Sequence, residues 1–248
     1  GTITGRMTHR NPNMAQVPNI HSPFGKECRA CWSVPEGYKL VGIDASGLEL
    51  RMLAHYMNDS NYIEEVVNGD IHSTNQELAG LKTRDQAKTF IYALVYGAGD
   101  AKIGSIINGD IKKGKALKNR FFSNLPALKK LRDRVQQAAN RGFLKGIDGR
   151  KIHVRSQHAA LNTLLQGSGA IVMKQAMINL YELIKLNVVD AHFVANIHDE
   201  WQLQVKESQA DYIGRLGVEC IEKVTEQFKM RCDLTGEYKI GGNWSETH

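Results

Sequence analysis

Two runs of apolar and β-branched residues around three polar side chains constrain the fold more than any other stretch. The segment Phe193–Val205 reads FVANIHDEWQLQV, with His198, Asp199 and Glu200 at its centre. A strand, a tight turn and a second strand fit this pattern, so we predict a β-hairpin whose tip carries two adjacent acids. Turns favour Asp for structural reasons alone. This stretch by itself therefore fits either acids that serve only the turn and solubility or acids with a chemical role.

A second buried strand ends in an acid far away in the sequence. Residues 38–45, YKLVGIDA, predict a strand that ends at Asp44, and residues 47–57 follow with helical spacing. If this strand neighbours the hairpin, Asp44 and Asp199 meet at one end of a sheet. Paired carboxylates suit magnesium and two-metal phosphoryl transfer. Asp44 also fits the N-cap of the helix that follows it.

The remaining pattern predicts an α+β fold, in which one small antiparallel sheet carries a mostly helical insertion at about 60–140. The expected strands lie at 38–45, 191–206 and about 236–241, with a further hairpin at 142–154 that turns at Asp148-Gly149. The expected helices lie at 47–57, about 62–67, 71–78, 83–96, 113–123, 125–140, 157–186 and 208–228. The first 37 residues show no clear periodicity and fit a loop-rich segment.

Composition indicates a globular protein without a membrane partner. Hydrophobic residues make up 42% and charged residues 23% of the 248 residues, and no apolar run is long enough to cross a bilayer. Lys and Arg outnumber Asp and Glu by 32 to 26. The stretch 112–134 is densely basic and fits either a solvated helix face or a phosphate-facing surface.

The cysteines favour reduced thiols over a metal centre. Cys28 and Cys31 form a CxxC, but Cys220 and Cys232 are twelve residues apart and supply no matching second pair. Zinc sites usually need such a pair, so we favour structural thiols in a cytosolic protein over a zinc site.

One predicted helix carries a stripe suited to polyphosphate. Arg84, Lys88 and Tyr92 are spaced i, i+4 and i+8 in the helix at 83–96, so they share a face. Cationic side chains on one stripe suit phosphate oxygens, and a Tyr one turn further along suits a base or sugar. An exposed helix face with one half-buried Tyr explains the same pattern equally well.

Three longer segments follow one another in the order DASGLELRMLAHYM, RDQAKTFIYALVYGAG and HDE. They resemble motifs A, B and C of the A-family DNA polymerases, which include bacterial DNA polymerase I and, as the closer branch, the replicative polymerases of lytic phages. The segments TGRMTHRNPNMAQVPN, GDIH, DGRKIHVRSQHAALNTLLQGSGA and GGNW extend the likeness over essentially the whole chain. The resemblance implies a right-hand polymerase, with a palm at 1–59 and 141–248 and inserted fingers at 60–140.

The resemblance implies catalytic and metal-binding roles for the paired acids and for three further residues. Asp44 and Asp199 would hold two Mg²⁺ ions, for which Mn²⁺ could substitute, together with the backbone carbonyl of Ala45. Glu200 would be a secondary acid. Lys88 would act with the two aspartates in catalysis, as the proton donor to the departing pyrophosphate.

Further residues would bind nucleotide and DNA. Glu49 would be the steric gate that excludes a ribose 2′-OH. The triphosphate and base of the incoming nucleotide would contact His72, Arg84, Lys88 and Tyr92. The primer end and minor groove would be lined by Arg6, Asn162, Gln166 and His198. Asn162 and Gln166 are four residues apart on a predicted helix, where their amides could donate to the minor-groove acceptors that every base pair offers, although a plain helix surface fits them too.

The implied function is template-directed DNA synthesis, in which deoxynucleotides are added to the 3′-OH of a primer-template. In family members a thumb and a 3′→5′ exonuclease precede these motifs, so we expect a split or truncated replicative polymerase with a separate chain that supplies both. We expect it in the cytoplasm, that of an infected bacterium if a phage encodes it. One alternative is a catalytically weak or inactive DNA-binding subunit that needs an N-terminal partner. The other is a metal-dependent nuclease.

Overall fold

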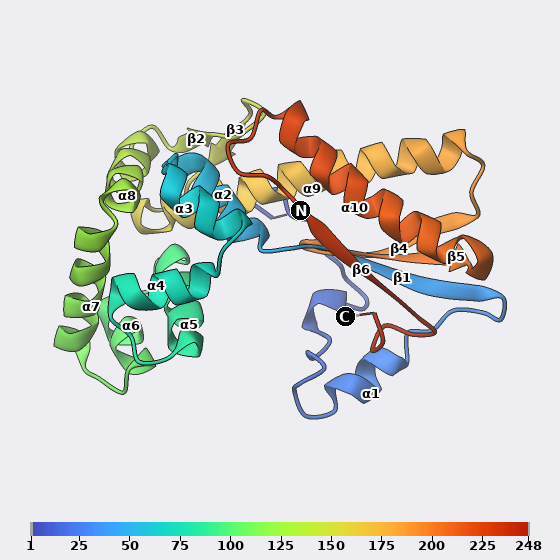
Figure 1. Ribbon diagram of the computed structural model, residues 1–248, viewed down its shortest axis with the longest axis horizontal. Helices are drawn as coiled ribbons and strands as arrows, with labels where there is room; N and C mark the ends of the chain where they lie inside the picture. The colour runs from blue at the N-terminus through green and yellow to red at the C-terminus, as the bar shows by residue number, and fades with distance from the viewer. Residues whose placement is uncertain (1, 248) are drawn as a thin grey trace. The chain divides into compact units, whose positions relative to one another are not determined.

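A computed structural model describes residues 2–247, which divide into two compact units (Figure 1). Unit 1 comprises Gly1–Leu48 and Gly169–His248, and unit 2 comprises Glu49–Ser168. Unit 2 extends on both sides of the helical insertion expected at about 60–140. The naming of palm and fingers segments remains a prediction.

The chain begins in unit 1, passes through unit 2 and returns to unit 1. Unit 1 includes η1 (Met14–Gln16), α1 (Gly25–Ala30), β1 (Tyr38–Ala45), β4 (Ala191–Ile197), β5 (Glu200–Lys206), η3 (Glu207–Gln209), α10 (Ala210–Gln227) and β6 (Gly236–Gly241). Unit 2 includes α3 (Ser60–Val67), α4 (Ile71–Ala79), α5 (Arg84–Val95), α6 (Asp100–Ile106), α7 (Ile111–Asn124), α8 (Pro126–Ala139), β2 (Phe143–Lys145), β3 (Lys151–His153) and η2 (Gln157–Ala159). The unit boundaries fall within α2 (Leu48–Met57) and α9 (Ala160–Leu186).

The sheet of unit 1 confirms that the strand ending in Asp44 and the distant hairpin are neighbours. Its strand order is β4-β5-β1-β6, and every neighbouring pair is antiparallel. Val41 and Ile43 of the inner strand β1 are fully buried. At the end of β1, Asp44 lies opposite Glu200 on one side and Glu237 on the other. One acid from each of three adjacent strands therefore occupies the same row of the sheet.

The predicted hairpin at 191–206 is confirmed. Strands β4 and β5 pair up to Ile197 and Glu200, which leaves His198 and Asp199 as the two-residue turn. His198 has a φ of 62°, in the left-handed region that such tight turns require. The turn thus holds Asp199 next to the row of acids on β1, β5 and β6.

Helix α10 packs against this sheet (Figure 1). Two of its glycines allow a close approach. A Cβ atom at Gly217 would collide with Ile43 of β1, and one at Gly214 would collide with the ring of Tyr238 on β6. This close approach packs α10 against β1 at Ile43, next to Asp44, and so helps to fix the strand that ends in Asp44.

In unit 2, the start of helix α5 and the position of its apolar face agree with the sequence prediction. The Thr83 hydroxyl caps it by accepting a hydrogen bond from the Gln86 N–H at 3.2 Å. Its buried residues are Ala87, Phe90, Ile91, Leu94 and Val95. The stripe of Arg84, Lys88 and Tyr92 lies outside that apolar face.

Two short helices, α1 and α6, were not predicted. Each has seven residues or fewer, too short for a clear periodic pattern. In α6, Gly104 lies directly against the backbone of Asp110, while Gly114 of α7 lies against the Asp100 carbonyl. These backbone contacts join residues 6 and 14 positions apart, in different elements or the loop between them, so helical periodicity could not reveal them.

All four cysteines lie within the described residues and are free thiols, with Cys220 and Cys232 buried and Cys31 exposed. Burial raises the pKa of Cys220 to about 11, so this thiol is unreactive near neutral pH. From Thr2 to Thr247, no helix is long and apolar enough to cross a membrane.

Candidate functional site

The acids of unit 1 converge where β1 meets the hairpin tip. The Ala45 N–H, next to Asp44, donates a hydrogen bond to the backbone carbonyl of Asp199 at 3.0 Å. Asp44 and Glu200 also line a cavity of about 180 Å³, together with Glu237 and Lys239. The structure therefore brings Asp44, Ala45, Asp199 and Glu200 together, as predicted, while their chemical roles remain predictions.

The charge state of Asp44 reflects this crowding. Burial first, and then the negative charges of Asp199, Glu200 and Glu237, raise the pKa of Asp44 to about 8, against the opposing effect of Lys239. Like charges directly opposite one another in a sheet are destabilising. A cluster of like charges that destabilises the folded protein in this way is typical of a functional site.

The carboxylates of this site fit a magnesium ion that is bound partly by the protein and partly by oxygen atoms of a substrate. Over residues 2–247 the structure shows no group of three or more His, Cys, Asp or Glu side chains that could hold a metal ion. Magnesium needs no such cage, because it takes one or two carboxylates and completes its shell with water and phosphate oxygens. Asp44 and Asp199 supply two carboxylates, and the excess negative charge around Asp44 favours a cation.

Glu200 is held in a buried network that the sequence did not reveal. Its side chain is 3% exposed, and Oε1 accepts hydrogen bonds from Trp244 Nε1 at 2.9 Å and from Gln202 Nε2. The guanidinium of the buried Arg29 lies 4.2 Å from the centre of the Trp244 ring. Thr247 donates to Gln202 at 2.8 Å. The GGNW segment thus anchors the acid beside Asp199, although the motif alone gave no sign of this contact.

Replacing Trp244 with Phe should destabilise unit 1, because a buried carboxylate loses one of its donors. A hydrogen bond to a charged group contributes about 1.5–3 kcal/mol, which is the expected loss in the free energy of unfolding, measured by urea denaturation. Trp201→Phe is the matched control, since Trp201 is fully buried and its Nε1 finds no partner within residues 2–247. Equal losses in the two variants would contradict a specific role for the bond to Glu200.

The predicted phosphate-binding residues of unit 2 form a continuous strip. Asp70 pairs with Arg84 at 2.8 Å, and its side chain also accepts the His72 N–H at 3.1 Å. Burial lowers the pKa of His72, and the nearby charges of Arg84 and Lys88 lower it further, against the opposing effect of Asp70. A neutral imidazole beside two cations can donate one hydrogen bond to a phosphate oxygen.

The strip continues through aromatic rings to the predicted sugar gate. The ring centres of His72 and Tyr92 are 6.3 Å apart, and those of Tyr92 and Tyr96 are 6.4 Å apart in a stacked arrangement. The Tyr96 hydroxyl donates to Glu49 Oε2 at 2.6 Å. Tyr96 was missed, although it extends the i+4 series of Arg84, Lys88 and Tyr92 by one step.

The four predicted DNA-contacting residues belong to different units. Asn162 and Gln166 are half-buried on α9 within unit 2, and Asn162 Oδ1 is buried without a partner among the described residues. In unit 1, Arg6 is half-buried and His198 is exposed at the hairpin tip. The shared helix face of Asn162 and Gln166 is confirmed, and the DNA contacts remain predictions.

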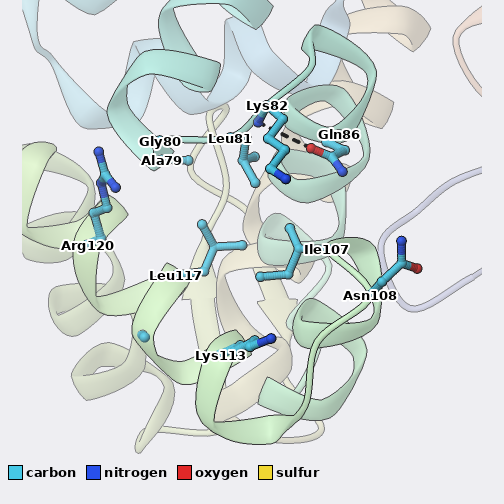
Figure 2. Close-up of a pocket in the computed structure, with 11 residues that line it drawn as sticks. Ala79, Gly80, Leu81, Lys82, Gln86, Ile107, Asn108, Lys113, Leu117 and Arg120 are labelled. Atoms are coloured by element: carbon cyan, nitrogen blue, oxygen red, sulfur yellow. Dashed lines mark hydrogen bonds between the residues drawn. The ribbon is translucent and has the colours of Figure 1, made fainter.

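A cavity of about 590 Å³ in unit 2 contains none of the predicted site residues (Figure 2). Lys82, Lys113 and Arg120 lie around it, and Leu81, Ile107 and Leu117 supply apolar surface. No acidic or aromatic side chain lines it. The cavity therefore lacks both the carboxylates and the base-stacking surface that the chemistry above requires.

Comparisons of this chain with protein families and with known proteins all match DNA polymerases. The family model described as DNA polymerase family A matches residues 1–246. The DNA-directed DNA polymerases of Enterobacteria phage T3 and Escherichia phage T7 are 42% and 41% identical to this chain. Each match covers 100% of this chain and 40% of the relative. The chain thus spans about two fifths of the length of these curated relatives.

More distant relatives extend the match to bacteria and to a solved structure. The thermostable DNA polymerase I of Thermus aquaticus is 27% identical over 98% of this chain and 31% of its own length. The POL domain of Pol1 from M. smegmatis, solved in complex with DNA primer-template and dNTP, superposes with a TM-score of 0.90. It is 25% identical, and the match covers 99% of this chain and 47% of that one. The predicted α+β polymerase fold is confirmed.

Proposed function

This chain belongs to DNA polymerase family A, and from that membership we propose that it adds deoxynucleotides to the 3′-OH of a primer-template. The observation that carries the proposal is the convergence of Asp44 and Asp199 at the end of β1, the strand at the centre of the site. Paired carboxylates at this place suit phosphoryl transfer, which depends on positioning and charge neutralisation rather than on a covalent intermediate.

In the proposed mechanism, Asp44 and Asp199 would hold two Mg²⁺ ions, with the Ala45 carbonyl as a further ligand. When bound, such ions neutralise phosphate charge and favour attack by the primer hydroxyl. Glu200 stays in its buried network and keeps the hairpin tip in place. The carboxylates of this chain therefore set where the reaction occurs.

The strip in unit 2 would serve the incoming nucleotide in the same reaction. Arg84, Lys88 and His72 bind the triphosphate, and Tyr92 stacks near the base. Lys88 gives a proton to the departing pyrophosphate. Asn162 and Gln166 check base-pair geometry through minor-groove acceptors, which do not depend on sequence. Arg6 and His198 contact the primer end.

Glu49 is proposed to exclude ribonucleotides, because its side chain is fixed by the hydroxyl of Tyr96 at 2.6 Å. Glu49→Ala should open space for a 2′-OH and raise ribonucleotide incorporation relative to deoxynucleotide incorporation by about ten- to a hundredfold. The ratio of kcat/KM values for ATP and dATP measures the effect. Glu64→Ala, on α3, is the control carboxylate deletion. Unchanged sugar selectivity in the Glu49 variant would remove the gate role.

The main contacts with duplex DNA are proposed to come from protein outside these 248 residues. The phage relatives are about two and a half times as long as the matched region, since that region covers 40% of each. We propose that a thumb and a 3′→5′ exonuclease are supplied by a separate chain or a further segment. The complete polymerase would work in the cytoplasm, that of an infected bacterium if a phage encodes it. Weak DNA binding by this chain alone would follow, because the thumb's phosphate contacts would be missing.

Single-nucleotide insertion tests the proposal. Four primer-templates differ only in the first templating base, and each is offered each dNTP with magnesium. Template-directed synthesis predicts that only the complementary dNTP is added at each template. Addition irrespective of the template would contradict it, and shortening of the primer would indicate a metal-dependent nuclease.

A further inference from the structure

One carboxylate outside the predicted site holds Arg84 at the end of the strip. Asp70 Oδ2 accepts from Arg84 Nε at 2.8 Å, and Oδ1 accepts from Nη2 at 3.0 Å. This is a bidentate ion pair between the residue that caps α4 and the first residue of α5. Both side chains are about half exposed, at 45% and 50%.

The same carboxylate fixes the start of α4, which carries His72. Its Oδ1 atom accepts from the His72 N–H at 3.1 Å and from the Ser73 N–H at 3.4 Å, and Oδ2 accepts from the Ser73 hydroxyl at 2.8 Å. Asp70 therefore joins two of the residues proposed to bind the triphosphate. The hydrogen bonds from Arg84 and Ser73 hold the pKa of Asp70 well below its ordinary value, so the carboxylate is ionised at neutral pH.

The pairing leaves most of the Arg84 fork available. A guanidinium has five N–H donors, and the bonds to Asp70 use one on Nε and one on Nη2. The remaining donors, on Nη1 and the outer side of Nη2, form the other edges of the plane. Arg84 can therefore bind phosphate oxygens while its inner edge stays on Asp70.

We propose that Asp70 is a positioning residue, which holds Arg84 and the first turn of α4 in the arrangement that receives the triphosphate of the incoming nucleotide. This inference rests on the proposed function of the strip. A long, half-exposed arginine that is already ordered loses less conformational freedom on binding, so pre-organisation raises affinity. The opposing effect is the negative charge of Asp70, which repels phosphate. Solvent screens that charge, and its partner Arg84 already neutralises it.

Asp70→Asn separates the two tasks of this side chain. Asn caps a helix about as well as Asp, so α4 keeps its start, but an amide cannot offer two anionic oxygens to Arg84. The KM for dNTP should rise about three- to tenfold, with kcat changed less than about twofold. Asp70→Ser, which also retains a cap, should give the same shift. Asp110→Asn is the matched control, because Asp110 caps α7 through the Lys113 N–H at 2.8 Å.

A double-mutant cycle with Arg84→Ala decides whether Asp70 acts through Arg84. Asp70→Asn should have no further effect on KM once Arg84 is removed. A KM that stays constant or falls in Asp70→Asn would overturn the inference. An equal shift in the Arg84→Ala background, or in Asp110→Asn, would overturn it as well.

Equilibrium binding of a dNTP to the chain, measured without primer extension, separates this inference from the proposed function. Weaker binding by Asp70→Asn than by the wild type supports the inference, even if the chain incorporates no nucleotide and the proposed function fails. Equal dNTP binding by Asp70→Asn and the wild type overturns the inference about Asp70 and leaves the proposed polymerase function intact. Absence of dNTP binding by the wild-type chain overturns the inference too.

Discussion

Asp44→Ala and Asp199→Ala are each expected to lower the rate of nucleotide incorporation by about a thousandfold or more. Each variant would lose one of the two carboxylates proposed to hold magnesium, and a bound metal contributes several kcal/mol of transition-state stabilisation. The rate is measured in a single turnover with saturating dNTP and with the chain in saturating excess over primer-template, so that weak DNA binding or slow product release does not hide the loss.

Folding should survive these substitutions. Asp44 sits among the negative charges of Asp199, Glu200 and Glu237, so its removal relieves repulsion within the sheet. We expect the free energy of unfolding of Asp44→Ala to be equal to or above that of the wild type. Glu219→Ala, an exposed acid on α10, controls for a general loss of negative charge and should retain full activity. Retained incorporation in either aspartate variant would end the metal assignment.

Lys88→Ala is expected to slow incorporation by about a hundred- to ten-thousandfold, the range for loss of a general acid. Lys88 is exposed on α5 and lies close enough to His72 to lower the pKa of that imidazole. It is therefore in place beside the other residues proposed to bind triphosphate. Single-turnover rates at saturating dNTP isolate the chemical step from the loss of affinity.

Lys88→Arg distinguishes charge from proton donation. Arginine keeps the positive charge but does not release its proton in proteins, so this variant should recover dNTP affinity and not the rate. Lys129→Ala, an exposed lysine on α8, is the control and should leave both unchanged. Full recovery of the rate by Lys88→Arg would show that Lys88 contributes charge alone.

The parts of the fold that depend on local patterns could be predicted from the sequence. Strand β1 and the hairpin of β4 and β5 are apolar runs that end in polar residues, and helix α5 carries a periodic apolar pattern with a cap signal at its start. The proximity of Asp44 and Asp199 needed one further step, the pairing of β1 with β5. The strand register confirms this pairing.

The parts that could not be predicted depend on contacts between distant segments. The bond from Trp244 to Glu200 joins residues 44 positions apart, and the stacking of Arg29 on Trp244 joins the first helix to the last segment. Neither contact leaves a periodic trace in the sequence. The pairing of Asp70 with Arg84 spans 14 positions and two helix starts. It becomes visible only when α4 and α5 pack together.

Roles at the site came from the family resemblance rather than from patterns. Spacing alone placed Arg84, Lys88 and Tyr92 on one face and allowed either a phosphate site or a plain helix surface. Their continuity with His72 and Glu49 in the structure favours a single binding strip. This continuity does not identify the substrate, so nucleotide binding by the strip is tested by the kinetics of the variants.

Primer extension tests the central claim most directly. Purified chain, a primer-template, magnesium and four dNTPs are incubated together, and then again with any chain that co-purifies from the native source. We expect extension that follows the template in at least one of these reactions, and none when Asp44→Ala replaces the wild type. Extension only with the second chain would place the DNA grip there. No extension in either reaction would contradict the claim that this chain carries a polymerase active site, and would leave a non-catalytic DNA-binding subunit.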